Sequence, residues 1–221
     1  MANLWHRWST LTECVRAGKS AETRSSSWVK DFIAAMDHGA KEAVGAVINA
    51  TGRKVKRMLD LGGGSGAYSI AFARVIPGLK VELLDLGEII PLTQENIQNA
   101  GLADRIATRI ADVLHDPLGE NFDLVLLSQI SHAFSAKENR ELFRRAYCAL
   151  APKGQMVVQD FILEPDKTAP RAATLFALNM LAGTRAGATY SEAEYASWLQ
   201  DAGFKDVRRI RPGGLMIGIR R

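Results

Sequence analysis

Short apolar runs alternate with amphipathic segments over most of the chain. Runs such as FDLVLLS and QMVVQDF are largely apolar at successive positions, as strands buried on both faces of a parallel sheet are. The segments between the runs repeat their apolar residues at helical spacing, which is typical of amphipathic helices. The pattern predicts strands at 56–61, 80–85, 106–111, 122–128 and 155–161 and helices at about 67–76, 88–100 and 136–150.

The end of the chain follows a different pattern. Residues 170–183 predict one helix, and 191–204 predict another, which a capping box of Ser191 and Glu194 would open. Two short strands around Pro212-Gly213-Gly214 then predict a hairpin. Together with the alternating elements before it, this pattern predicts an α/β fold with a mostly parallel seven-stranded sheet and a C-terminal antiparallel hairpin.

The first part of the chain shows helical patterns only. A stripe at helical spacing predicts a short amphipathic helix that would pack on the chain's own core or on another subunit, and it consists of Leu4, Trp8, Leu11 and Val15. We therefore expect a helical extension packed on the core at 1–54 and an α/β domain at 55–221.

Composition narrows the class of protein. The chain has 221 residues, of which 47% are hydrophobic and 24% charged, as in ordinary globular proteins. Its apolar runs are too short to span a membrane, and we see no signal peptide. The cysteines Cys14 and Cys148 form no CxxC pair, which indicates reduced thiols and a cytoplasmic protein. The net charge is +4, and the basic C-terminal residues lack interleaved aromatics, so a solvated strand pair is favoured over a nucleic-acid surface.

The stretch MLDLGGGSGAYS, residues 58–69, is the strongest candidate for a ligand site. It places Gly62, Gly63, Gly64 and Gly66 where a strand ends and a helix begins, the position at which backbone N–H groups converge on a ligand. The spacing also fits the permissive dinucleotide pattern G-x-G-x-x-A. Asp85, at the end of the next strand, could accept the ribose hydroxyls of any adenosine, so a dinucleotide and S-adenosyl-L-methionine (SAM) both remain possible at this point.

Three details favour SAM. Asp60 precedes the glycines, where a carboxylate would attract the amino group of a methionine moiety and repel a pyrophosphate. The loop follows a long helical segment, whereas dinucleotide folds usually open with it. Asp112 ends the third strand, where its carboxylate and the following N–H could bind an adenine edge. A nicotinamide-dependent oxidoreductase and a non-catalytic SAM-binding subunit stay open as alternatives.

The residues from Asp60 to Gly66 match the motif D/E-x-G-x-G-x-G, and the chain resembles the class I SAM-dependent methyltransferases. It is similar over about residues 3–211 to the caffeate-type O-methyltransferase family, which includes many bacterial natural-product enzymes. The segments that carry this resemblance are FIAAMDHGAK, ELLDLGEII, ISHAFS and YSEAEYASWLQDAGF.

The resemblance implies a Rossmann-like class I methyltransferase that binds SAM, releases S-adenosyl-L-homocysteine (SAH) and methylates a hydroxyl of a small aromatic or polyketide-like metabolite. His132 stands at the position of the family's general base, and Asp160 at that of the acidic residue beside it. We see no cluster of metal-ligating residues. The predicted cofactor-binding residues are Asp60, Gly62, Gly64, Gly66, Asp85, Leu86, Asp112, Val113 and Ser128.

The predicted acceptor-binding residues lie on two helices, Phe32 and Met36 on one and Asn179 and Met180 on the other. The chain departs from the family where a second flanking acid would stand, because Thr189 or Ala188 occupies that place. Family members also carry a dimerisation domain ahead of this unit, so the resemblance implies a homodimer or a separate dimerisation or partner subunit.

Overall fold

The computed structural model describes residues 5, 8–18, 20, 40, 43–52, 54–211 and 214–221. Its centre is a seven-stranded sheet in the order β3-β2-β1-β4-β5-β9-β8. Strands β1 to β5 run parallel, and β9 is antiparallel to β5 and to β8. The predicted α/β class and sheet are therefore confirmed. The strands are β1 Arg57–Leu61, β2 Lys80–Asp85, β3 Ile106–Ile110, β4 Phe122–Ser128, β5 Leu150–Gln159, β8 Lys205–Ile210 and β9 Leu215–Ile219.

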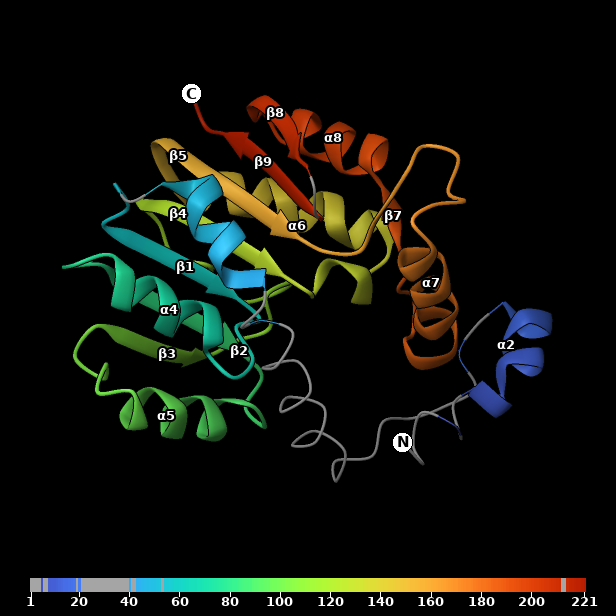
Figure 1. Ribbon diagram of the computed structural model, residues 1–221, viewed down its shortest axis with the longest axis horizontal. Helices are drawn as coiled ribbons and strands as arrows, with labels where there is room; N and C mark the ends of the chain where they lie inside the picture. Colours follow the sequence, from blue (N-terminus) through green and yellow to red (C-terminus); the bar gives the residue numbers. More distant parts are fainter. Residues whose placement is uncertain are drawn as a thin grey trace.

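Helices cover both faces of this sheet (Figure 1). Residues 43–51 are helical and lie in front with α4, and α6 lies behind. A short parallel pair, β6 Ile162–Leu163 and β7 Tyr190–Ser191, forms a second small sheet. The helices are α2 Leu11–Ala17, α4 Ala67–Val75, α5 Ile90–Asn99, α6 Ala136–Ala149, α7 Arg171–Gly183 and α8 Glu192–Asp201, with a 3-10 turn η2 at Ser131–Ala133. The predicted capping box at the start of α8 is confirmed, and it consists of Ser191 and Glu194.

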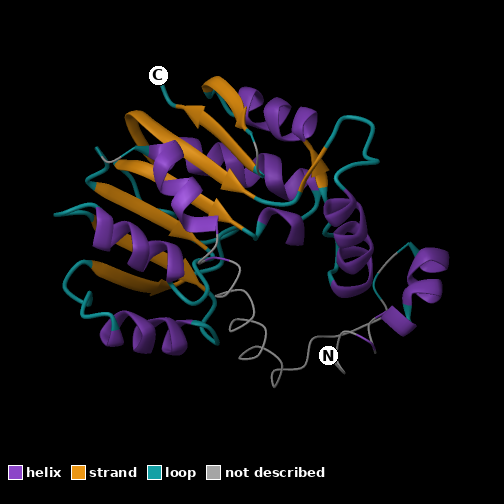
Figure 2. Cartoon of the chain, in the orientation of Figure 1, coloured by secondary structure: helices purple, strands orange, loops and turns teal. Residues whose placement is uncertain are grey.

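The core consists of two apolar layers because successive strand residues point to opposite faces. In β4, Leu124 and Leu126 pack with the helix of residues 43–51 and with α4 and α5. Their neighbours Val125 and Leu127 pack with α6 and α8 on the other face. Figure 2 shows these strands in orange between the purple helices. A strand buried on both sides is apolar at successive positions, which is why the apolar runs predicted the first four strands to within one residue.

The fifth strand differs from its predicted bounds of 155–161. It begins at Leu150, and its pairing with β4 shifts register between Leu150 and Gln155. A β-carbon on Gly154 would meet the carbonyl oxygens of Ala151 at 2.8 Å and of Phe122 at 2.9 Å, so the irregular segment needs a glycine there. The strand also ends at Gln159, which leaves Asp160 just beyond the sheet.

The N-terminal stripe is only partly as predicted. Helix α2 contacts α7, and its buried residue is Cys14. Trp8 is 37% exposed and Val15 is 61% exposed, so these two members of the stripe are not part of the chain's own core, and Leu4 lies outside the described residues. By contrast, Val47 and Ile48 are buried against the sheet. The boundary at residue 54 stays a prediction.

The basic residues near the C-terminus have local partners. The Arg220 guanidinium donates to the carbonyls of Tyr147 and Cys148, both at 3.1 Å, and Arg221 pairs with Asp206. Arg209 and Arg211 pair with Glu164 and Glu192. The described part of the chain contains no helix long and apolar enough to cross a bilayer.

Candidate active site

The glycine loop joins β1 to α4 at the carboxyl end of the sheet. Gly62, Gly64 and Gly66 all have positive φ, at 66°, 56° and 80°, a conformation that other residues rarely adopt. A β-carbon on Gly62 would collide with the side chain of Ile130, and one on Gly63 with that of Leu83. The packing of Ile130 and Leu83 therefore explains why Gly62 and Gly63 are glycines, whether or not a ligand approaches the loop.

Asp60 lies beneath this loop and is 1% exposed. Its Oδ2 accepts a hydrogen bond of 2.6 Å from the Ser69 hydroxyl. Burial raises the pKa of the Asp60 carboxyl to about 6, and Asp85 adds to the rise while the Ser69 bond opposes it. No lysine or arginine among the described residues forms a salt bridge with it. A buried carboxylate without a cationic partner is suited to the ammonium group of a ligand.

Asp85 lies at the end of β2 and binds the backbone of the glycine loop. Its Oδ2 accepts from the Gly64 N–H at 2.8 Å, and its Oδ1 accepts from the Leu86 N–H at 2.7 Å. Burial raises the pKa of Asp85, and these two backbone bonds counteract the rise. A carboxylate has about four acceptor positions, so each oxygen can still accept one ribose hydroxyl. Leu86 is 46% exposed and offers an apolar surface beside them.

Asp112 and Val113 begin the turn after β3. The Asp112 Oδ1 accepts from the Leu114 N–H at 2.8 Å. Its other oxygen lies 4.0 Å from the His115 ring. The Val113 N–H has no acceptor among the described residues. A carboxylate oxygen that accepts no hydrogen bond, beside an N–H that donates none, is complementary to an adenine edge, which offers an amino donor next to a ring-nitrogen acceptor.

Ser128 lies at the end of β4 between the loop and the predicted base. Its hydroxyl donates to the Gln159 Oε1 at 2.9 Å, and the Gln129 amide donates to the same oxygen at 3.2 Å. The Tyr68 hydroxyl reaches it at 3.4 Å. Gln159 was not among the predicted site residues, because an uncharged residue at a strand end gives no sequence signal of a shared acceptor.

His132 and Asp160 meet at the ends of β4 and β5. The His132 Nδ1 lies 2.7 Å from the Asp160 Oδ1, and the His132 N–H donates to Oδ2 at 3.1 Å. The Phe161 N–H also donates to Oδ1 at 2.8 Å. A proton on Nδ1 is favoured by this geometry, which leaves the Nε2 lone pair free to accept one. The His132 ring also contacts the Phe176 edge at a centroid distance of 4.7 Å.

A loop between α7 and β7 packs against the backbone of His132. The Ala188 N–H donates to the His132 carbonyl at 3.0 Å, and the Gly187 N–H donates to the Thr184 hydroxyl at 2.8 Å. A β-carbon on Gly187 would collide with the same His132 carbonyl. The backbone of the predicted base is thus fixed by a segment more than 50 positions away in the sequence.

The comparison with protein families agrees with this geometry. Residues 12–205 match the family model of the O-methyltransferase domain. The chain belongs to the O-methyltransferase family. The methyl donor of this family is SAM, which decides between the two cofactors that the glycine loop allowed.

Relatives of this chain are found among natural-product proteins. The 3-hydroxy-5-methyl-1-naphthoate 3-O-methyltransferase of Streptomyces sahachiroi is 39% identical over 75% of the chain and 49% of its own length. The tetracenomycin polyketide synthesis 8-O-methyl transferase of Streptomyces glaucescens is 29% identical over 94% of the chain and 64% of its own length. A crystal structure of a putative O-methyltransferase from Nostoc punctiforme PCC 73102 superposes with a TM-score of 0.89, at 28% identity, over 98% of the chain and 68% of that protein. The chain thus spans about half to two thirds of these relatives.

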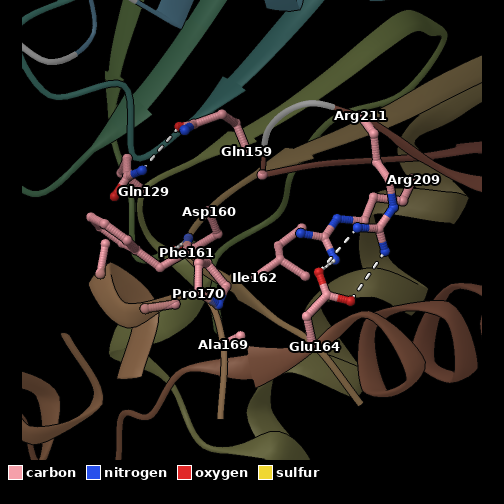
Figure 3. A pocket seen from close by; sticks show the side chains of 13 residues that line it. Gln129, Gln159, Asp160, Phe161, Ile162, Glu164, Ala169, Pro170, Arg209 and Arg211 are labelled. Carbon is pink, nitrogen blue, oxygen red and sulfur yellow. Dashed lines mark hydrogen bonds and ion pairs between the residues drawn. The ribbon is translucent and has the colours of Figure 1, made fainter. Parts of the chain in front are cut away.

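A cavity of about 610 Å³ borders the pair of His132 and Asp160 on the side of Asp160 (Figure 3). Gln129, Gln159 and Phe161 form one end of it, and Arg209 and Arg211 line the other, where they pair with Glu164. The Phe161 ring stacks on Phe176 at 4.0 Å. This volume is within the range of small-molecule sites in proteins.

The predicted acceptor residues are divided between the described and undescribed parts of the chain. Phe32 and Met36 lie outside the described residues. Asn179 and Met180 are on α7, and neither lines the cavity in Figure 3. The Asn179 Oδ1 is buried and has no hydrogen-bond partner within the described residues. Phe176, three residues before Asn179, contacts His132 and could have been found from helical spacing.

The family's second flanking acid is absent from the place where the resemblance located it. Thr189 there is 5% exposed, and its hydroxyl donates to the Ala173 carbonyl at 3.3 Å. Within the described residues, no three potential ligands gather as a metal site would require.

Proposed function

We propose that this chain transfers the methyl group of SAM to a hydroxyl of a small aromatic or polyketide-like metabolite, with His132 as the general base. The observation that carries this proposal is the 2.7 Å contact between the His132 Nδ1 and the Asp160 Oδ1. The two Streptomyces relatives, named as O-methyltransferases of a hydroxynaphthoate and in tetracenomycin polyketide synthesis, support the acceptor class.

The residues along the strand ends fit the cofactor. Asp60 would hold the ammonium group, because a buried carboxylate that lacks a cationic partner gains most from one. Asp85 would accept the ribose hydroxyls, with Leu86 beside them. Asp112 and Val113 would bind the adenine edge, and Ser128 would lie near the centre of the cofactor.

SAM supplies an already electrophilic methyl group, so the protein has to orient the acceptor and remove its proton. The free Nε2 of His132 would accept the hydroxyl proton as the oxygen attacks. Asp160 would hold the ring in this orientation and stabilise the imidazolium that forms. Correct alignment of the reacting atoms can supply roughly 7–11 kcal/mol of the barrier reduction.

The acceptor would lie beside Phe176, Asn179 and Met180, with Phe32 and Met36 as further predicted contacts. We also propose that the whole protein acts as a homodimer or with a separate dimerisation subunit. The exposed Trp8 and Val15 support this idea, since they lack apolar cover within the described chain.

Replacing the base tests the proposal. His132→Ala should lower turnover by about 10²- to 10⁴-fold, the usual contribution of general-base catalysis. The affinity for SAH, measured by calorimetry, should stay within about twofold of the parent, because His132 would not contact the adenosine or the methionine end. Asp160→Asn should lower turnover as well, because a neutral amide stabilises the imidazolium less.

The same measurements separate the alternatives. Equal losses of turnover and SAH affinity in His132→Ala would overturn the assignment of the base. SAH binding without methyl transfer to any hydroxyarene would favour a non-catalytic subunit.

A further inference from the structure

Arg145 connects a helix behind the sheet to the turn that follows β3. It lies in the second half of α6. Its Nη1 donates to the Val113 carbonyl at 2.7 Å, and its Nη2 donates to the Asp116 carbonyl. The planar guanidinium thus holds two carbonyls of one turn at once, which the single ammonium of a lysine does less well.

The turn from residue 112 to 116 is closed by bonds of its own. The Asp116 Oδ2 accepts from the Asp112 N–H at 2.8 Å, and the Asp116 N–H donates to the Asp112 carbonyl at 2.8 Å. These bonds leave the Val113 N–H without an acceptor, and they leave one Asp112 carboxylate oxygen without a hydrogen bond, 4.0 Å from the His115 ring. The peptide unit that carries the free N–H is held through the Asp112 carbonyl, which accepts from the N–H groups of His115 and Asp116. Arg145 holds the next carbonyl, that of Val113, and the carbonyl of Asp116, so it fixes this whole turn against α6.

We propose that Arg145 is a positioning residue for adenine recognition: it fixes the Asp112–Val113 pair so that the site selects adenine over hypoxanthine. This inference rests on the proposed SAM-binding function. It adds a residue from α6, on the opposite face of the sheet from α4, to a site otherwise formed by strand ends and loops.

The chemistry of the two bases makes the inference specific. Adenine offers an amino donor and a neighbouring ring-nitrogen acceptor, which complement the carboxylate oxygen and the N–H. Hypoxanthine offers a carbonyl oxygen and a ring N–H at these positions, so both contacts become repulsive. If the Asp112 carboxylate and the Val113 N–H are held in place, the site distinguishes strongly between adenine and hypoxanthine. If they can rotate away from the base, the site loses this selectivity.

The test compares Arg145→Met with Arg144→Met. Arg144 is a matched control, because it is the preceding residue on α6, its side chain is 65% exposed and it pairs with Glu141. Calorimetry would measure the dissociation constants of SAH and of S-inosyl-L-homocysteine, its hypoxanthine analogue. We expect the parent and Arg144→Met to prefer SAH by at least about tenfold, in line with other bidentate base contacts. We expect the preference in Arg145→Met to fall to about threefold or less.

The ratio of the two affinities separates positioning from stability. Partial unfolding would weaken both ligands equally and leave the ratio unchanged, because both bind the same folded state. Arg145→Lys, which keeps the charge and can hold one carbonyl, should give an intermediate ratio if the methionine variant does not fold.

An unchanged ratio in Arg145→Met, or in Arg145→Lys if the methionine variant does not fold, would overturn the role of Arg145 while the proposed function stands. A parent protein that binds SAH and its hypoxanthine analogue equally would also overturn it, by removing the adenine contact itself. Failure of the parent to bind SAH would instead overturn the proposed function.

Discussion

Asp60 shows how one buried residue links the stability of the fold to its ligand. The raised pKa means that the folded chain holds this proton up to about pH 6, whereas an unfolded aspartate releases it near its ordinary pKa of 3.8. The folded state therefore binds more protons between these values, and the contribution of Asp60 to stability falls as the pH rises from about 4 to about 6. Above that range the cost is constant at about 3 kcal/mol, since one pKa unit corresponds to about 1.36 kcal/mol.

An ammonium group beside Asp60 should lower this pKa again. We predict that SAH binding at pH 5.5 releases about three quarters of a proton, because that fraction of Asp60 is protonated in the free protein at a pKa of about 6 and the carboxyl is ionised in the complex. Calorimetry in two buffers with different ionisation enthalpies measures this number, which should approach zero at pH 8.

Asp60→Asn is the control for proton release. It should abolish the release at pH 5.5 and also remove the fall in stability between pH 4 and pH 6 that Asp60 causes. Binding by the parent protein at pH 5.5 without proton release would show that no cation approaches this carboxylate.

At the scale of elements, the predicted base depends on the loop between α7 and β7. Residues 184–189 contact η2 through the bond from the Ala188 N–H to the His132 carbonyl. Gly187 lies against this carbonyl at a distance that leaves no space for a β-carbon. The loop therefore fixes the backbone position of His132.

Gly187→Ala should displace His132 and lower turnover by about tenfold or more, since misplacement of a catalytic group by about 1 Å can cost 10²-fold. SAH affinity should remain within about twofold, because the nearest neighbours of a β-carbon at Gly187 are His132, Thr184 and Ala133 rather than the predicted cofactor-binding residues. Gly45→Ala is the matched control: a β-carbon there would meet no other part of the described chain within 4 Å, and the residue lies in the helix of residues 43–51. Equal turnover in the two variants would contradict the positioning role of the loop.

At the scale of the whole molecule, an aromatic cluster supports one face of the sheet. Trp198 on α8 is 1% exposed and contacts the rings of Tyr190, Tyr195 and Phe143. These residues come from α6, β7 and α8, so the cluster joins the C-terminal helices to the rest of the core. Its loss should weaken the entire fold.

Trp198→Ala should lower the free energy of unfolding by about 3–5 kcal/mol through loss of buried area and the cavity that remains. The melting temperature, followed by circular dichroism, should fall by roughly 10 °C for a domain of this size. Trp5→Ala is the control, because Trp5 is 79% exposed and its removal leaves no cavity. A similar change in both variants would show that the cluster contributes little to stability.

Much of the architecture follows from the sequence alone. The strands are apolar throughout because both faces are covered, the helices carry apolar stripes, and Ser191 with Glu194 forms its cap locally. Asp60, Gly62 and Asp85 could be placed at one edge because parallel strands end on the same side of a sheet. These features depend on residues close in sequence or on a general rule of sheet geometry.

Only the tertiary structure decided the contacts between distant segments. It brought Asp160 to within 2.7 Å of His132, Gly187 against the His132 carbonyl, and Arg145 to the turn at Val113. It also showed that the side chains of Ile130 and Leu83 fill the space beside Gly62 and Gly63. The glycine pattern alone could not tell whether a side chain or a ligand occupies that space. Local periodicity reports which face of an element is buried, but not which side chain from another element reaches that face, because such contacts depend on how all the elements pack together.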